Sequence, residues 1–547
     1  MLESYLSTLF LISNIFGYSA LCKYILNRSN KVCNIDFIYG IFFAVVLSLL
    51  LNLFLPLRYF SIIFLFFGFL LFFIFLVLKH FQLNFYLLSL ITFFVVFISH
   101  QQSITYDSQL YHLQVLQLSH NYKAIFGIGN LQPHYAMNSS WHSLLSIIDI
   151  KLFNINFIYL ANLSLFIIFI SEALIKNLKQ VKKLSNIFLT LTILYILMYS
   201  FFHPYGNGTI LNLLGSPEAD FPAALFFILI IYLFISYYEK HEKEILWLIL
   251  LTSFILITTK ISYLGSFLFI IYSILLCRKN FIIFEKINLA LMFACILWLI
   301  KGFISSGCFI FPISFTCVTT SWSMNIDEVQ SYSNIVQSFA RDTPLRINFT
   351  NFDYTLYSFD WFKPWVKEYF FKTELLFVSF AFILLSILYL IFKFIKLNLK
   401  LGNIFKNFYL HLIFLIFFNL FIWMKAPEIR FGYGSIISLS CILLSLVIYD
   451  IFQKYLEQKK LINFIIVIFF IPIFIKNLDN KNNINKISFV RNFDYSNFEK
   501  IYEVNNYVVF KPTQNNFCNK FQGFCTYQGF RVNIVESNSY LFMNKNK

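Results

Sequence analysis

The segment from residue 100 to residue 142 gathers side chains that can move protons or bind ligands. It holds Asp107 and five histidines: His100, His112, His120, His134 and His142. After Asp107, leucines recur near a helical period, and the opposite face carries Gln109, His112, Gln114 and Gln117. This pattern predicts an amphipathic helix near residues 107–118 that lies on a membrane surface. Asp107 begins it, so its carboxylate can cap free backbone N–H groups or act as a general base.

A second acidic segment stands just before an apolar run, where Glu218 and Asp220 lie between two prolines. Acids are favoured at helix starts because they offset the positive end of the helix dipole. Carboxylates near hydrocarbon are also costly, and they mark functional sites more often than chance. We therefore interpret Asp220 as a helix-start acid, a second catalytic acid or a cation ligand.

Three basic residues lie at the ends of apolar runs: Lys260, Lys301 and Arg430. Each lysine can extend its amine to water, or it can neutralise a lipid phosphate. Arg430 is the stronger phosphate partner, because its planar guanidinium binds two oxygens at once.

The spacing of these residues does not define a metal site. A helical zinc motif places two histidines four positions apart, and no such pair occurs between residues 100 and 142. A divalent cation is one option, and its identity is unknown. Neither a Walker A sequence nor a dinucleotide fingerprint is present, so the sequence requires no nucleotide cofactor.

Composition indicates that lipid is the solvent for much of the chain. Of its 547 residues, 59% are hydrophobic and only 12% charged, whereas soluble domains carry about 25% charged residues. The mean hydropathy is +0.72. The net charge of +16 comes largely from short basic loops between apolar runs, as the sorting of Lys and Arg to the cytoplasmic side predicts. A nucleic-acid partner is therefore not expected.

The apolar runs predict an all-α, polytopic integral membrane protein with about fourteen transmembrane helices of roughly 20 residues each. The expected spans are 4–26, 35–55, 58–78, 83–99, 155–175, 185–202, 220–238, 245–259, 262–277, 286–304, 373–395, 407–424, 432–452 and 461–476.

One orientation places every strongly basic loop in the cytoplasm. It puts both termini outside the inner (cytoplasmic) membrane. The transmembrane domain is then 1–476, followed by a small extracytoplasmic tail, 477–547. The loops expected on the outer face are 100–154, 203–219, 305–372 and 425–431.

Four of the nine cysteines fall on the expected outer face, where the compartment permits disulfides. Cys518 and Cys525 close a short loop in the tail, so we expect a bond between them. Cys308 and Cys317 can form a second bond or remain free thiols.

Several motifs resemble those of a family of bacterial multi-spanning membrane proteins that is itself similar to GT-C-type glycosyltransferases. The matching segments, in the same order along the chain, are 106–112, 129–141, 216–222, 306–312 and 426–434. The resemblance implies a donor sugar carried on polyprenyl phosphate. Asp107 matches the early acidic motif of that class, Asp220 its second acidic position, and 132–135 the Pro-containing stretch that follows. Two features depart from the class: Ser108 stands where glutamate is frequent, and four expected spans, instead of one, precede Asp107.

We therefore expect a glycosyltransferase that moves a sugar from polyprenyl phosphate to a cell-envelope lipid, glycan or protein. Asp107 is the expected base and Asp220 the second catalytic acid. The residues expected to bind substrate are His112, His134, Tyr135, Glu218, Lys260 and Arg430. A polysaccharide polymerase or ligase uses the same compartment and lipid, so it remains an alternative. A transporter or flippase of lipid-linked glycans is also open, although few charges lie at span centres and no two-fold repeat is seen. A purely structural membrane protein remains a fourth possibility.

Overall fold

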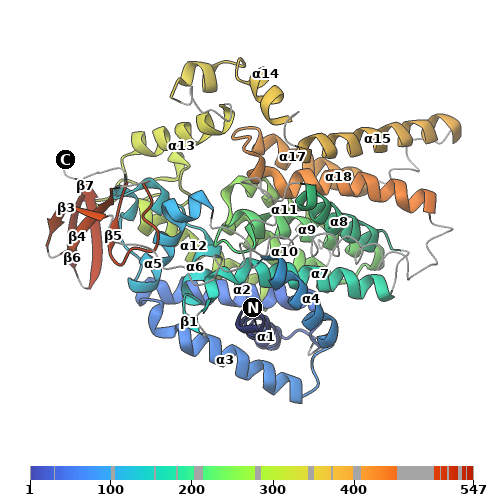
Figure 1. Ribbon diagram of the computed structural model, residues 1–547, viewed down its shortest axis with the longest axis horizontal. Coiled ribbons are helices and arrows are strands. Elements are labelled where there is room, and N and C mark those ends of the chain that lie inside the picture. Colours follow the sequence, from blue (N-terminus) through green and yellow to red (C-terminus); the bar gives the residue numbers. More distant parts are fainter. Residues whose placement is uncertain are drawn as a thin grey trace.

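The computed structural model describes residues 2–29, 31–99, 105–152, 155–179, 183–202, 213–276, 285–342, 350–370, 374–397, 408–452, 498–505, 507–513, 516–527, 532–537 and 539–545. Over these residues the protein is mostly helical, with a group of short strands near the C-terminus (Figure 1). The α-helices are α1 (Leu2–Ile25), α2 (Phe37–Phe54), α3 (Arg58–Val77), α4 (Phe85–Ser99), α5 (Leu113–Asn121), α6 (Ser140–Ile147), α7 (Ala161–Lys179), α8 (Leu184–Phe202), α9 (Asp220–Lys240), α10 (Lys243–Thr259), α11 (Phe267–Leu276), α12 (Lys286–Ser306), α13 (Ile326–Arg341), α14 (Phe362–Trp365), α15 (Glu374–Leu397), α17 (Phe408–Trp423) and α18 (Ile429–Phe452).

Each expected span up to residue 452 coincides with helix, and the range 262–277 is shared by η7 (Ile261–Ser266) and α11. By length and composition, seven helices are able to cross a membrane: Leu2–Ile25, Asn34–Phe54, Arg58–Val77, Phe157–Lys176, Asp220–Lys240, Lys286–Ser306 and Ile429–Ile451. Five further apolar helical stretches among the described residues are 10–17 residues long, whereas a span needs roughly 20: Phe85–Phe97, Leu184–Leu197, Ile261–Leu276, Val378–Tyr389 and Tyr409–Trp423. The described helices thus indicate a polytopic membrane protein but do not confirm fourteen spans. The last expected span, 461–476, lies outside the described residues.

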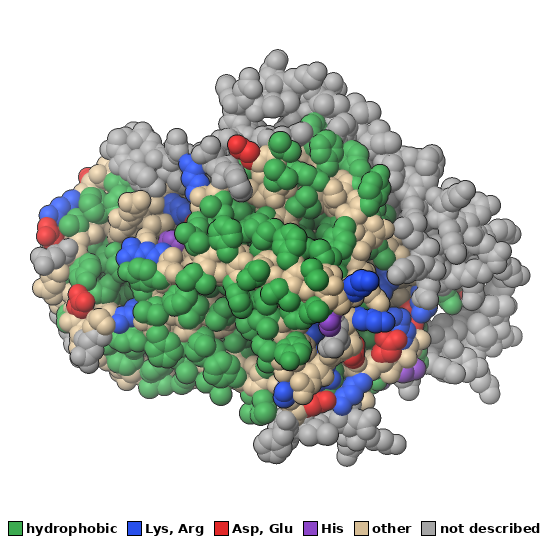
Figure 2. Space-filling model, turned by 90° about the horizontal axis from the view of Figure 1, so that it is seen from below, with side chains coloured by type: hydrophobic (Ala, Val, Ile, Leu, Met, Phe, Trp, Pro, Cys, Tyr) green, Lys and Arg blue, Asp and Glu red, His purple; other side chains and the backbone are tan. Residues whose placement is uncertain are grey.

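Apolar side chains cover one broad face of the molecule. Figure 2 shows them across its middle, while charged side chains gather toward its two ends. Helix α3 presents an exposed apolar surface formed by Tyr59, Ile62, Ile63, Phe66, Phe67, Leu70, Phe73, Ile74 and Val77. Water disfavours such a continuous surface, and lipid does not, so this belt suits a bilayer.

Close helix packing brings the starts of two long helices together. Helix α18 packs against α8, α9 and α15, and α9 also packs against α10. Because Asp220 begins α9 and Arg430 lies in the first turn of α18, their side chains meet at one end of this bundle. Elsewhere, small residues permit tight contact, as in other membrane helices. A Cβ added at Gly17 of α1 lies only 1.9 Å from the carbonyl oxygen of Gly68 on α3.

The C-terminal tail folds into strands, so the all-α prediction is wrong for this part of the chain. Strands β3 (Phe498–Val504) and β4 (Tyr507–Pro512) form an antiparallel pair, and β5 (Phe524–Cys525) runs parallel to β4. Strands β6 (Val532–Ser537) and β7 (Tyr540–Lys545) form a second hairpin. Val532 and Ile534 are buried and alternate with exposed neighbours, as side chains of a strand do. A hydropathy average over 20 residues does not detect this alternation. A further short pair joins β1 (Lys151–Leu152) to β2 (Ile155–Asn156).

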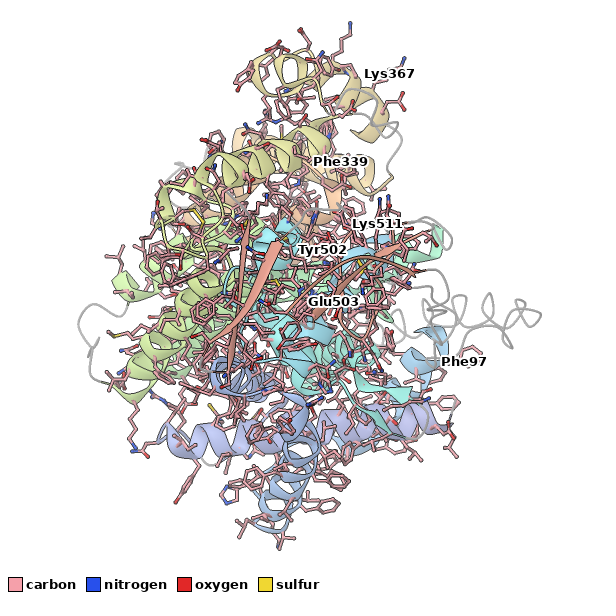
Figure 3. All side chains as sticks on the ribbon, turned by 90° about the vertical axis from the view of Figure 1, so that its left-hand side faces the viewer. Phe97, Phe339, Lys367, Tyr502, Glu503 and Lys511 are labelled. Atoms are coloured by element: carbon pink, nitrogen blue, oxygen red, sulfur yellow. A yellow bond between two sulfur atoms is a disulfide. The ribbon has the colours of Figure 1, made fainter. Side chains whose placement is uncertain are left out.

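The tail packs on the segment that was expected to lie on the membrane surface. Residues 108–112 form a π turn, η2, which continues into α5. Leu113 and Leu116 are fully buried, as expected for the apolar face, but Gln114 is fully buried too. Its amide donates to the carbonyl of Gly523 in the tail. The polar face of this segment is therefore buried at Gln114, where the tail packs against it. Figure 3 looks onto these strands, with Tyr502 and Glu503 on β3 and Lys511 on β4.

Candidate active site

Four of the predicted site residues form one ion-pair network. The Arg430 guanidinium lies 2.5 Å from a carboxylate oxygen of Asp107 and 3.7 Å from one of Asp220. The other oxygen of Asp220 pairs with the ammonium of Lys260. Over 300 residues separate Asp107 from Arg430 in sequence, so the fold alone unites them. The network alternates charge, which is how partly buried charges are normally stabilised.

The two aspartates do not act as helix caps, although both stand at helix starts. The Asp107 side chain makes no capping hydrogen bond to the turn η2 that follows it. For α9 the N-cap position is Ala219, and Asp220 lies inside the first turn. The structure therefore disfavours capping for Asp107, whereas Asp220, in the first turn of α9, agrees with the interpretation as a helix-start acid. Their carboxylates face the cations instead.

A cavity of about 1040 Å³ adjoins this network. Asp107, Asp220 and Lys260 contribute the charged part of its wall. The apolar part includes Trp298, Phe309, Ile310, Phe311, Pro312 and Phe431. A cavity with charge at one side and hydrocarbon at the other suits a ligand that is itself amphipathic. The ring of Phe431 also lies beneath the Lys260 ammonium, 4.1 Å from ring centre to nitrogen.

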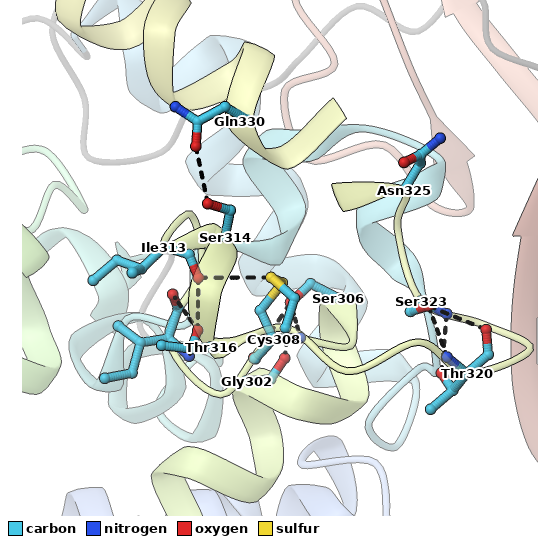
Figure 4. The surroundings of a disulfide bond; sticks show 12 residues. Gly302, Ser306, Cys308, Ile313, Ser314, Thr316, Thr320, Ser323, Asn325 and Gln330 are labelled. Carbon is cyan, nitrogen blue, oxygen red and sulfur yellow. Dashed lines mark hydrogen bonds between the residues drawn. A yellow bond between two sulfur atoms is a disulfide. The ribbon is translucent and has the colours of Figure 1, made fainter. Parts of the chain in front are cut away.

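A disulfide closes the loop that supplies the apolar wall. Cys308 and Cys317 form a disulfide (Figure 4). The sequence had left open whether these two cysteines are bonded or free. The Ser306 hydroxyl accepts from the backbone N–H of Cys308 at 3.1 Å, and α12 ends there. The bonded loop holds Ile310 and Phe311 against the cavity. In the tail, Cys518 and Cys525 are bonded as well, as the sequence predicted.

Three histidines line the cavity beside Asp107: His112, His134 and His142. The rings of His112 and His142 lie 4.6 Å apart, and the Tyr527 hydroxyl lies 3.0 Å from Nδ1 of His134. Burial lowers the pKa of all three, that of His134 to about 4 and that of His142 to about 3. At neutral pH they are therefore uncharged, and each can offer one ring nitrogen as acceptor and the other as donor.

These shifts predict that acid destabilises the protein. Histidines in the unfolded chain have a pKa of about 6.5, so below that pH they bind protons that the buried histidines of the folded protein do not bind. The free energy of unfolding therefore falls as pH falls from 6.5 toward 4. Each histidine contributes up to about 1.4 kcal/mol per pH unit in that window. The thermal unfolding of purified His142→Gln protein in detergent should depend less steeply on pH than that of the wild type. Equal slopes would contradict the prediction.

The variant comparison is needed because a nearby carboxyl titrates in the opposite sense. Burial raises the pKa of Glu218, and Asp107 adds to the rise, while Arg430 and Lys260 oppose it. A carboxyl whose pKa is raised in the folded state stabilises that state at low pH, and this stabilisation is lost as pH rises. The difference between wild type and His142→Gln cancels this contribution, because Glu218 is present in both.

Three of the expected substrate ligands, Tyr135, Glu218 and Arg430, do not line the cavity that Asp107 lines. Tyr135 points into the tail, where its hydroxyl donates to the Cys525 carbonyl at 2.7 Å. Its part is therefore to hold the tail in place. Glu218 is 1% exposed and lies behind the network, where its charge interacts with Arg430 and Asp107. His112, His134 and Lys260 do line the cavity. Arg430 pairs with Asp107 and Asp220, both of which line it.

Some cavity residues could not be assigned from the sequence. Among the five histidines of the segment 100–142, His142 had no expected role. Trp298 lay inside an expected span. Tyr527 lies in the tail, 393 residues from the histidine that it contacts. No local pattern links such distant positions, so only the fold reveals them. As for a metal, no group of three or more His, Cys, Asp or Glu in the described part of the chain is placed to hold one.

Comparison with known proteins places this site within a family. Residues 1–437 match the family model described as a domain of unknown function, DUF8201. The chain belongs to this family. No curated protein and no solved structure matches it. The DUF8201 match includes Asp107, Asp220, Lys260 and Arg430, whereas Tyr527 and the tail disulfide lie beyond it. The family description carries no activity, so any function must be argued from the chemistry of the site.

Proposed function

We propose that the protein is a membrane glycosyltransferase that moves a sugar from a polyprenyl-phosphate donor to a cell-envelope acceptor. The observation that carries the proposal is the network of two carboxylates and two cations at the edge of a cavity with an apolar wall. The resemblance of the motifs around Asp107 and Asp220 to GT-C-type enzymes adds support. The reaction takes place at the outer face of the inner membrane, where the lipid donor enters from the bilayer.

The reaction needs a base and a site for the leaving phosphate, and the network supplies both. An acceptor hydroxyl attacks the anomeric carbon of the donor sugar and forms a new C–O bond. The bond from that carbon to the phosphate oxygen breaks, and the electron pair leaves with polyprenyl phosphate. Asp107 takes the hydroxyl proton. Arg430 and Lys260 stabilise the negative charge that develops on the leaving phosphate.

The ion pairs explain how the base is held before the donor arrives. Without substrate, the Asp107 carboxylate lies against Arg430 at 2.5 Å. A donor phosphate competes for the guanidinium, which has five N–H donors in a planar fork and can bind both partners. Asp107 lines the cavity, where the acceptor hydroxyl arrives. Asp220 keeps Lys260 in place at the cavity wall.

The donor's chemistry matches the wall opposite the charges. A polyprenyl chain offers only hydrocarbon, so it requires an apolar surface that excludes water. Trp298, Phe311 and Phe431 provide such a surface. Aromatic rings also stack on the apolar faces of sugars, which positions the anomeric carbon near the carboxylates.

The first test replaces Asp107 with Asn in the native host and compares surface glycans by mass spectrometry with those of the wild type and of a deletion strain. We expect the Asn variant to lose the same glycan mass as the deletion, because the amide cannot accept the proton. Rate losses for a missing general base are typically about 10²- to 10⁴-fold. Asp360→Asn serves as the control, since Asp360 is an exposed aspartate, and it should leave the glycans unchanged.

The remaining outcomes are also decisive. If the deletion alters the glycans but Asp107→Asn at normal membrane levels does not, Asp107 is not the base. If neither strain differs from the wild type, the protein does not transfer sugar to a surface glycan. The lost mass itself identifies the transferred sugar.

A further inference from the structure

A second cavity, here called the Lys301 cavity, adjoins the first one. Its volume is about 520 Å³, counted together with the part that is open to solvent. Five residues line both cavities and so form a shared wall: Val115, Met137, Asn138, Ser139 and His142. Its remaining wall includes Lys123, Ser143, Lys301 and Ser305. No aspartate or glutamate lines it.

Lys301 is a buried cation without a counter-ion in the described part of the chain. It is 9% exposed, and its ammonium donates to the Ser143 hydroxyl at 2.8 Å. No carboxylate of the described residues lies within ion-pair distance of it, in contrast to the buried Lys23, which pairs with Asp36 at 2.8 Å. An ammonium has three donors, so one hydroxyl leaves it mostly unsatisfied. Burying a charge in this way is costly unless an anion completes the site.

The other polar groups of the Lys301 cavity already have partners within the protein. The half-buried Lys123 adds a second positive charge to the lining, and its ammonium bonds the Ser539 hydroxyl at 2.7 Å and lies over the Tyr540 ring. The Ser305 hydroxyl donates to the Lys301 carbonyl at 2.9 Å, and the Asn138 amide donates to the Trp298 carbonyl at 2.6 Å. The Lys301 ammonium is therefore the group that an anion would bind, in a lining that contains two lysines and no acid.

We propose that the Lys301 cavity binds a phosphate group of the acceptor substrate. The acceptor role of the bound molecule rests on the proposed function, whereas the phosphate site itself rests on Lys301 and its surroundings. The shared wall separates the acceptor phosphate from the donor phosphate at Arg430, which limits repulsion between the two anions. His142 lines both cavities, so the acceptor hydroxyl reaches Asp107 past the His142 side chain. The phosphate belongs either to a lipid head group or to a soluble acceptor.

The test measures phosphate binding by thermal unfolding of the full-length protein purified in detergent. Inorganic phosphate is the probe, with chloride at equal ionic strength as the reference. We expect phosphate to raise the Tm of the wild type, and Lys301→Met to reduce that rise. Lys301→Arg keeps the charge and should retain it. Lys500→Met removes an exposed lysine paired with Glu503 in the tail, so it should behave as the wild type. An equal rise in the wild type and Lys301→Met, or no rise in either, overturns the proposal.

A second measurement separates an anion site from a purely structural hydrogen bond. Without phosphate, Lys301→Met removes an uncompensated buried charge, so its Tm should equal or exceed that of the wild type. If Lys301 serves only to bond Ser143, the same variant should unfold at a lower temperature in phosphate and in chloride alike. That result also overturns the proposal.

The source of the phosphate is distinguished in nanodiscs. Phosphatidylcholine discs are compared with discs that also contain phosphatidylglycerol, for the wild type and for Lys301→Met. A stabilisation by phosphatidylglycerol that requires Lys301 identifies a lipid head group. A Lys301-dependent effect of inorganic phosphate alone identifies a soluble acceptor.

Failure of this inference and failure of the proposed function give different results. If Asp107→Asn leaves the glycans unchanged while phosphate stabilisation still requires Lys301, the phosphate site stands and the acceptor role falls with the enzyme activity. If Asp107→Asn abolishes the glycan but Lys301→Met leaves it at the wild-type level, the transferase stands and the acceptor assignment is wrong.

Discussion

Replacing Arg430 with Gln is expected to lower the free energy of unfolding by about 3 kcal/mol and to abolish activity. Arg430 is the only side chain in the described part of the chain that pairs with both Asp107 and Asp220. Its removal leaves Asp107 without its ion-pair partner and Asp220 with Lys260 alone. A partly buried carboxylate without a cation is destabilising, because protein replaces water around it. Chemical denaturation of the purified protein measures the first effect, and glycan mass spectrometry in the native host measures the second.

A double variant separates the structural part of this loss from the functional part. In Asp107→Asn/Arg430→Gln, the unpaired carboxylate at position 107 is gone, so stability should recover in part. Activity should not recover, because both the base and the phosphate ligand are missing. Arg430→Lys should be intermediate in stability and poor in activity, since a lysine cannot bind two oxygens in a plane. Full activity in Arg430→Lys, or an unchanged stability in Arg430→Gln, would contradict the role given to the guanidinium.

Sequence reasoning located the chemistry of the site because burial of charge is rare in membrane proteins. Asp107, Asp220, Lys260 and Arg430 were recognisable as ionisable residues beside apolar runs, and the structure brings them together. Their partners were not predictable, because hydropathy gives the order of helices and not which helix ends meet. Whether the acids cap their helices also required the structure, since a capping and a catalytic role both place a short acid at a helix start.

The tail shows where the same reasoning was insufficient. Its strands are short and polar on one side, so an apolar-run analysis reads the segment as a solvated tail. Tyr135 was expected to bind substrate and Gln114 was placed on the polar face of a membrane-surface helix, yet both side chains bond backbone carbonyls of the tail. Long-range contacts of this kind leave no signal in local sequence. They matter for the site because Tyr527, which bonds His134, belongs to the tail.

Replacing Lys520 with Met is expected to release the tail from the cavity. Lys520 forms an ion pair with Asp149, whose side chain is 1% exposed. Without the lysine, Asp149 keeps only the amide of Asn156, which donates at 2.8 Å. Leaving such a charge buried costs about 3 kcal/mol. Undocking lets water reach the carboxylate, so the cost should appear as more frequent opening of the tail.

Hydrogen exchange of the peptide 516–527 measures this opening. In the docked tail the Asn519 amide donates to the Gln109 carbonyl at 2.8 Å. Exchange there should be about 100-fold faster in Lys520→Met, the factor that corresponds to about 3 kcal/mol. Lys500→Met, which breaks only the exposed pair with Glu503, should leave exchange unchanged. Asp149→Asn/Lys520→Met removes both charges and should restore slow exchange.

The glycan level of Lys520→Met shows whether the tail contributes to the site. Opening moves Tyr527 away from His134 and admits water beside Asp107, which weakens the electrostatic stabilisation of the leaving phosphate. Glycan mass should therefore fall in Lys520→Met and recover in the double variant. If exchange accelerates while glycan mass stays at the wild-type level, the tail is a stabilising cover only, and the catalytic cavity is complete within residues 1–437.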